Sequence, residues 1–224
     1  MDKEVKLRQA AVIAQPDQVV LEPGELNAVL EVTLKRPDGT IKEQWVRKSE
    51  SFVRQFIDLL TVQMGLVWEG SPLSIRDVTN NLIDVALSHY NFAADALVSD
   101  DSYSIVVGTG STAPAIDDHA LGAKTANGAG AGQLQYSLTA FGLPTAGADQ
   151  SHFTITRDFS NVSGAAITVN EIGLCVKGQQ ACPFKADVSR PVAIFMVIRD
   201  VIAGGIAIGN GETLTINYRL VAQV

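Results

Sequence analysis

An acid and a thiol lie close together in the stretch 163–178, which reads SGAAITVNEIGLCVKG. Glu171 stands at the centre of an apolar, β-branched run, and Cys175 follows in the same run. A positioned carboxylate can act as a general base, and a thiol can act as a nucleophile when a base or a cation activates it. The same two residues also suit a structural hairpin, so the rest of the sequence must decide between catalysis and structure.

No other part of the sequence completes a catalytic set with these residues. The chain contains no Gly-x-Ser-x-Gly elbow, and no histidine lies near a serine or cysteine with an orienting acid. The histidines His89, His119 and His152 are scattered, and the spacing of Cys175 and Cys182 matches no zinc motif. We therefore expect no catalytic residue, no metal ligand and no cofactor, and we expect that the protein is not an enzyme.

Two glycine-rich stretches, GTGSTAP from Gly108 and GAKT from Gly122, invite a phosphate-binding interpretation. A phosphate-binding loop needs Gly-x4-Gly-Lys-Ser/Thr, so that backbone amides and the lysine surround the phosphates. Lys124 does not directly follow a glycine, and the GAGAG run lacks the spacing of a dinucleotide-binding loop. We interpret both stretches as structural turns. The acidic stretches SDD and IDDH likewise match no calcium-binding pattern.

Composition limits the classes of partner. The chain has 224 residues, a net charge of −7 and a pI near 4.9, which gives no electrostatic footprint for nucleic acid. No apolar run reaches the roughly 18 residues of a membrane span, and the charged start MDKEVKLRQ does not resemble a signal peptide. Charged residues make up 18% of the chain, whereas about 25% is usual. This low charge favours an assembly component, and a large core is the alternative explanation.

Residues 1–101 contain predicted strands followed by a helix. A first strand is expected at 5–14, and 26–48 predicts a hairpin because Pro37 presets φ while Asp38-Gly39 tolerates the positive φ of a tight turn. The stretch 49–65 predicts an amphipathic helix, since apolar residues recur along one stripe. The stripe consists of Phe52, Phe56, Leu60 and Met64, with Val53 and Ile57 beside them.

Residues 102–224 contain short β segments at regular intervals. They are YSIVVG, QLQYSLTAF, HFTITRDF, AAITVNEIGLCV, VAIFMVIRDV and ETLTINYRLVAQV. Apolar and polar residues alternate in several of them, which is typical of strands, while VAIFMVI predicts a central strand covered on both faces. We therefore predict a mainly β fold, an antiparallel β-sandwich of jelly-roll or Ig-like kind with one amphipathic helix in the N-terminal half. Its two parts, 1–101 and 102–224, can also form a single intertwined domain.

Within this sandwich, a structural role for Glu171 is the better hypothesis. Asn170-Glu171 breaks the alternation between Val169 and Ile172, as a β-bulge does, and would aim the carboxylate at a neighbouring amide or at Arg157.

Three neighbouring features are interpreted in the same way. The sequon at Asn161 is interpreted as the turn between two strands. Cys175 and Cys182 flank the next turn, where a disulfide would form only outside a reducing compartment. The loop 121–133, rich in glycine and alanine, has little side chain to offset its ordering, so we expect it to be mobile in a free subunit.

The order of segments in 102–224 resembles phage virion proteins of the tail-collar fibre type. The resemblance runs from IVVGTGSTAPAIDDHAL through QLQYSLT and FTITRDF to ITVNEIGLCV, PVAIFMVIRDVI and IGNGETLTINYRL. Those proteins have a similar glycine turn, a similar Glu-Ile-Gly-Leu strand and a similar last strand. Cys175 stands where they have an aromatic or aliphatic residue, and GQQACPF departs from their usual turn. Residues 1–101 lie outside the resemblance and are a candidate docking part.

The resemblance implies a non-enzymatic structural subunit of a bacteriophage virion, first of all a tail or collar/fibre-attachment component that forms a homo-oligomer. Its expected partners are itself and other virion proteins, with no nucleic acid and no membrane, after synthesis in the host cytoplasm. One alternative is a capsid decoration (cement) protein. Another is a module that binds host-surface carbohydrate, which would need exposed aromatic rings. Aromatic residues are only 6% of the chain, and Trp45 and Trp68 precede its β half.

Overall fold

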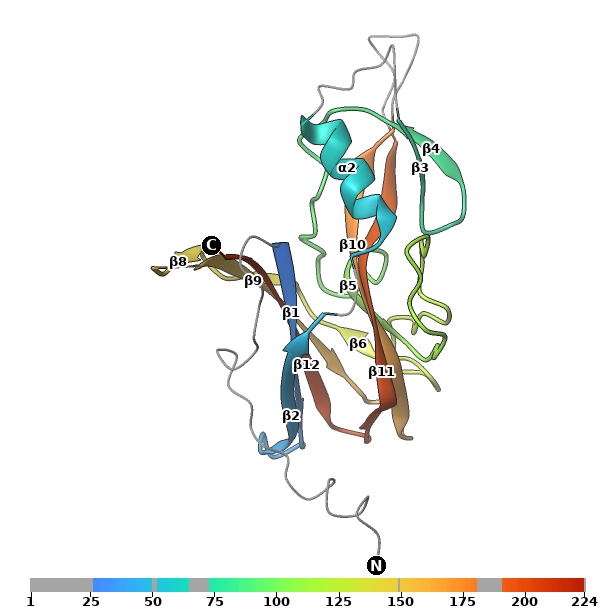
Figure 1. Cartoon of the computed structure of the whole chain (residues 1–224). Helices are drawn as coiled ribbons and strands as arrows, with labels where there is room; N and C mark the ends of the chain where they lie inside the picture. The colour runs from blue at the N-terminus through green and yellow to red at the C-terminus, as the bar shows by residue number, and fades with distance from the viewer. Residues whose placement is uncertain (1–25, 50–51, 65–72, 149, 181–190, 224) are drawn as a thin grey trace, which may run out of the picture.

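The computed structural model describes residues 26–49, 52–64, 73–148, 150–180 and 191–223. The strand expected at 5–14, together with Trp68 and Cys182, lies outside these residues. The described chain is mainly β, built from antiparallel sheets and a helix, as the sequence predicts (Figure 1). The sheets are not closed into a barrel.

The first sheet joins the two halves of the sequence. Its strands are β2 (Ile41–Lys48), β1 (Leu26–Lys35), β12 (Thr213–Gln223), β9 (Gln150–Ser160) and β6 (Gln135–Tyr136), in that order. The short strands β7 (Ala140–Phe141) and β8 (Thr145–Ala146) also pair with β9. β1 pairs with β12 over its whole length, from Leu26 opposite Ala222 to Lys35 opposite Thr213. Residues on both sides of position 102 therefore build one sheet.

The second sheet has the order β11-β10-β5, and its strands are β11 (Val192–Ile208), β10 (Ile167–Gln179) and β5 (Ser104–Gly108). The position predicted for VAIFMVI in β11 is wrong, because β10 is the central strand. The side chains from Phe195 to Asp200 are nevertheless buried in succession. The edge of β11 is covered by the chain before the helix, where Phe52 bridges Ile198 and the Val53 amide donates to the Val197 carbonyl at 3.1 Å. β3 (Leu73–Arg76) and β4 (Leu82–Val85) form a separate two-stranded sheet, and Val85 bridges Gln180 directly after β10.

The predicted hairpin 26–48 is confirmed as β1 and β2. Gly39 has a φ of +82°, and Asp38 Oδ1 accepts hydrogen bonds from the hydroxyl and the amide of Thr40 at 2.6 and 2.9 Å. These hydrogen bonds lower the pKa of Asp38. The turn is thus specified by local chemistry.

The predicted helix is present as α2 (Arg54–Met64), and its apolar stripe is only partly buried. The residues that α2 buries are Gln55, Leu59 and Val62, with a helical spacing of their own. Ile57 and Met64 are 58% and 75% exposed. The face of the helix that carries Gln55, Leu59 and Val62 is buried because it packs against β11 and β3. No helix among the described residues is long and apolar enough to cross a membrane.

The main core fills the space between the two sheets. Leu30, Val32 and Leu34 of β1 and Ile216 of β12 are fully buried, in one cluster with apolar residues of β5, β10 and β11. The sheets are also joined by a buried hydrogen bond from the Tyr218 hydroxyl of β12 to Asp200 Oδ2 of β11, at 2.8 Å. Burial and the nearby Asp200 charge raise the pKa of Tyr218.

Candidate functional site: a buried carboxylate and an apolar groove

Glu171 is fully buried, and the backbone of a distant loop surrounds its carboxylate. The pairing of β10 with β11 shifts register between Val169 and Glu171, so the predicted bulge is confirmed. Oε1 accepts hydrogen bonds from the amides of Gly110 at 3.0 Å and Ala123 at 2.7 Å, and Oε2 accepts one from the Gly122 amide at 3.0 Å. The bulge therefore aims the carboxylate at neighbouring amides, as the sequence predicts.

The cation beside Glu171 is Arg199 of β11, and the prediction of Arg157 for this place is wrong. Arg199 donates from Nε and Nη2 to Glu171 Oε2 at 3.2 and 2.8 Å, and from Nη1 to Asp118 Oδ2 at 2.7 Å. Burial opposes the charged form of this guanidinium, but its hydrogen bonds to the two carboxylates and their negative charge outweigh burial and raise the pKa of Arg199. Arg199 reaches Glu171 because it lies on β11, the strand that pairs with the bulge in β10.

The glycine-rich stretches form a cradle for this internal anion. A Cβ on Gly108 would lie 2.6 Å from Glu171 Oε1, and one on Gly110 would lie closer still. The backbone can approach the carboxylate only because these positions lack side chains. Amides from both stretches that invited a phosphate-binding interpretation thus point at an anion, and that anion is the protein's own Glu171. The arrangement ties the loop 109–123 to the second sheet.

Arg157 is a second buried cation, with a role that the sequence analysis missed. Its guanidinium donates to the carbonyl oxygens of five residues in neighbouring loops and β5. They are Tyr103 at 3.0 Å, Ser137 at 3.0 Å, Ile105 at 3.1 Å, Leu97 at 3.2 Å, and Asp100. Its Cζ also lies 4.9 Å from the centroid of the Tyr136 ring, and burial lowers the pKa of Arg157. The sequence feature that could have indicated this buried role is the position of Arg157 on the apolar face of β9, between Ile155 and Phe159.

The remaining polar candidates are not brought together. His89 stacks on Tyr90 at 4.0 Å between centroids, and His152 faces Val221 across β9 and β12, while His119 lies in the 109–123 loop. Within the described residues, no three metal-binding side chains cluster. Cys175 is a buried free thiol, and burial raises its pKa to about 12.

Asn161 is a buried turn residue, in agreement with the interpretation of its sequon. Its Nδ2 donates to the carbonyl oxygens of Ala165 and Ile208, each at 2.7 Å. Its Oδ1 accepts from the Ser163 amide at 3.0 Å. The side-chain amide is thus used to join the end of β9 to the start of β10.

The loop 121–133 has partners inside its own chain, so the premise of its predicted mobility is wrong. Lys124 Nζ lies 2.9 Å from Asp101 Oδ1, and Asp101 Oδ2 accepts from the Asn127 amide at 2.6 Å. The Thr125 amide donates to the Val107 carbonyl at 2.9 Å. Backbone amides and one ion pair therefore replace the apolar side chains that the loop lacks.

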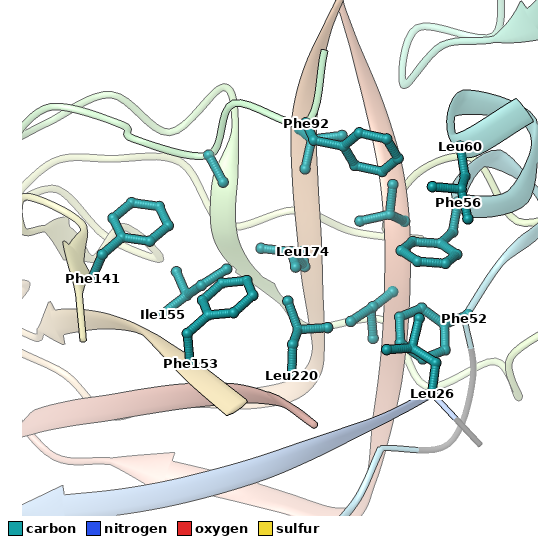
Figure 2. Close-up of a pocket in the computed structure, with 14 residues that line it drawn as sticks. Leu26, Phe52, Phe56, Leu60, Phe92, Phe141, Phe153, Ile155, Leu174 and Leu220 are labelled. Atoms are coloured by element: carbon teal, nitrogen blue, oxygen red, sulfur yellow. The ribbon is translucent and has the colours of Figure 1, made fainter. Parts of the chain in front are cut away.

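An apolar groove opens between the two sheets, at the end of the first sheet where β1 begins and β12 ends, with a cavity of about 320 Å³ (Figure 2). All the residues that line it are hydrophobic. From the first sheet these are Leu26, Phe141, Phe153, Ile155 and Leu220, and from the second sheet Leu174, Val176, Val197 and Ile198. The chain around α2 adds Phe52, Phe56 and Leu60, and the chain before β5 adds Phe92 and Ala94.

The groove contains part of the apolar stripe of the helix, namely Phe52, Phe56 and Leu60. The Phe52 and Phe56 rings lie 4.5 Å apart, and Phe92 meets Phe56 edge-on at 5.9 Å. Phe92 has a φ of +66°, an unfavourable backbone conformation for a bulky residue, and its amide donates to the Lys177 carbonyl at 3.0 Å. The rim is open to solvent, since Leu26 and Phe141 are 48% and 49% exposed. This arrangement suits binding of an apolar group and offers no polar side chain for chemistry.

Neither models of known protein families nor the curated proteins and solved structures give a match to this chain.

Proposed function

We propose that the protein is a non-enzymatic structural subunit that assembles as a homo-oligomer in the virion of a tailed bacteriophage, as a tail or collar/fibre-attachment component. The observation that carries the assembly part is the open apolar groove. Exposed apolar surface is unfavourable by roughly 25 cal/mol per Å², and concentrated apolar patches mark sites of association. The low charge of the chain, at 18% of residues, supports the same function.

The contacts of the buried charged side chains support a structural role. Glu171, Arg157 and Arg199 are buried, and each one holds backbone or a charged partner in place. The carboxylate of Glu171 accepts five hydrogen bonds, so its lone pairs are already engaged by the protein itself. A general base, by contrast, must reach a proton of its substrate.

The phage part of the proposal rests on the resemblance of residues 102–224. The segments that carry it form β5, β6, β9, β10, β11 and β12 in chain order. Such an ordered series of antiparallel strands is compatible with a virion sandwich domain. Seven of the fourteen residues that line the groove lie on β9, β10, β11 and β12, so the proposed assembly surface is shared between the part of the chain that carries the resemblance and residues 1–101.

Two measurements test the proposal. Light scattering on the purified full chain should give a mass above that of one chain, and labelling of intact particles with an antibody to this protein should decorate the tail or collar. Decoration spread over the capsid would favour the decoration-protein alternative over the tail component. A stable, soluble monomer at high concentration would contradict assembly through the groove.

A further inference from the structure

We propose that the groove receives the bulge between β7 and β8 of a second copy, with Leu143 as the inserted side chain. This inference rests on the proposed homo-oligomeric function and names the surface through which it works. β7 and β8 both run antiparallel to β9, and the bulge is the shift in register between them, from Phe141 opposite Ile155 to Thr145 opposite His152. The segment 138–148, which contains this bulge, is here called the arm.

The arm presents an apolar side chain to water in a fixed conformation. Leu143 is 88% exposed, and Leu138 in the same segment is 58% exposed. The Gly142 amide donates to the Thr154 carbonyl at 2.8 Å, and the Gly147 amide donates to the Gln150 carbonyl at 2.7 Å, so the arm is held on β9 on both sides of Leu143. Figure 1 shows β8 and the start of β9 extending beyond the body of the molecule. Little conformational freedom would be lost when this bulge binds.

The groove matches such a side chain in size and polarity. Its volume of about 320 Å³ is at the lower end of the roughly 300–1,000 Å³ of small-molecule pockets, so it holds one or two side chains. Its wholly hydrophobic lining would leave a polar guest without hydrogen-bond partners. Gly142 and Pro144 flank Leu143 and add no polar side chain beside it.

Charge also favours a second copy at this surface. Each chain has a net charge of −7, so copies repel unless they meet where charge is absent. The arm reads LTAFGLPTAGA and contains no charged residue, and neither does the groove lining. Depletion of charge is the compositional sign of an interface core.

The chain's own groove does not shelter Leu143. Phe141 of the arm already forms the rim of that groove, at the left in Figure 2, while Leu143 stays 88% exposed. The arm and the groove rim are thus continuous on one molecule. In a dimer, the Leu143 side chain of each copy would lie in the groove of the other copy. Both arms and both grooves would then be buried in one symmetric interface.

The first test uses matched substitutions on the full chain. Leu143→Asp places a charge on the arm, Leu60→Glu places one in the groove wall on α2, and Leu82→Asp on β4 is the control for an exposed leucine outside both surfaces. By sedimentation velocity, we expect monomers for the two interface variants and the wild-type oligomer for Leu82→Asp. Circular dichroism checks that each variant is folded.

The second test mixes the two interface variants. A Leu143→Asp copy keeps its groove and a Leu60→Glu copy keeps its arm, so an equimolar mixture should regain a pairwise complex that neither variant forms alone. Cross-linking gives a measurement that needs no charged variant. One copy carries Leu143→Cys and the other carries Leu60→Cys, and both carry Cys182→Ser. When the two copies are mixed under mild oxidation, a disulfide should form between the chains.

The outcomes separate this inference from the proposed function. If wild type and Leu82→Asp are oligomeric and Leu143→Asp keeps the same mass, the arm is not the guest, while homo-oligomeric assembly stands. Loss of the oligomer in Leu60→Glu alone would overturn the arm and assign the groove to another segment or partner. A monomeric wild type would overturn both proposals.

Discussion

At the scale of single residues, Glu171 shows how a polar group can resemble a catalytic one and serve the fold. The sequence indicated a bulge and a carboxylate aimed at amides, and both are present. Its cation could not be identified from local pattern, because Arg199 belongs to another strand and faces the bulge only after pairing. Arg157 was placed correctly on an apolar face, yet its five carbonyl partners come from loops that no periodicity describes.

The first prediction concerns Glu171→Gln. An amide in this place keeps the shape but turns a donor toward the amides of Gly122 or Ala123 and leaves Arg199, which is itself buried, with less charge to balance it. Breaking one side of a buried pair costs about 3–5 kcal/mol, so we expect a loss of that order in the free energy of unfolding.

Chemical denaturation measures this loss. Glu31→Gln is the control, because Glu31 is only half-buried and accepts a cross-strand hydrogen bond from Asn217 Nδ2 at 3.2 Å; we expect a change below about 1 kcal/mol there. The structural role would be contradicted if Glu171→Gln were as stable as this control.

At the scale of elements, local chemistry was sufficient where the structure depends on near neighbours. The hairpin turn 36–40 follows from Pro37, Asp38 and Gly39, and the alternation in β9 and β12 matches their burial. The edge position of β11 was misjudged, and the surface that the stripe of α2 faces could not be predicted, for one shared reason. Both depend on what packs beside them, and an apolar residue at helical spacing can face a core or a groove equally well.

The second prediction concerns the loop 121–133. In the free chain, hydrogen exchange should be slow at the amides of Gly122, Ala123 and Thr125, which donate to Glu171 or to the Val107 carbonyl. It should be fast at the exposed Ala129 and Ala131. Exchange measured by NMR on the purified protein tests this. Uniformly fast exchange from 122 to 132 would restore the expectation of a mobile loop.

At the scale of the whole molecule, a strongly acidic chain carries an uncharged arm and an apolar groove. Association through these surfaces works against the mutual repulsion of the copies. Salt screens that repulsion, with a Debye length of about 8 Å at 0.15 M ionic strength, and leaves an apolar contact intact.

The third prediction follows from this balance. Raising sodium chloride should shift the wild-type chain toward the oligomer, as measured by the concentration dependence of its sedimentation. Leu143→Asp, compared with Leu82→Asp, should show no such shift. Dissociation of the wild-type oligomer by salt would indicate an interface held by ion pairs, contrary to the groove proposal.

The pairing of β1 with β12 also determines when the protein can fold. A ribosome releases residues 26–35 long before residues 213–223, so during synthesis β1 has only β2 beside it, and its other edge is unpaired. Leu30, Val32 and Leu34 meet their cross-strand neighbours Tyr218, Ile216 and Leu214 only when the last strand arrives. Contacts of such long sequence separation slow folding and leave strand edges open to other chains in the meantime. Completion of the first sheet is therefore a late event, and nascent chains crowded on one messenger are exposed to mispairing until β12 has emerged.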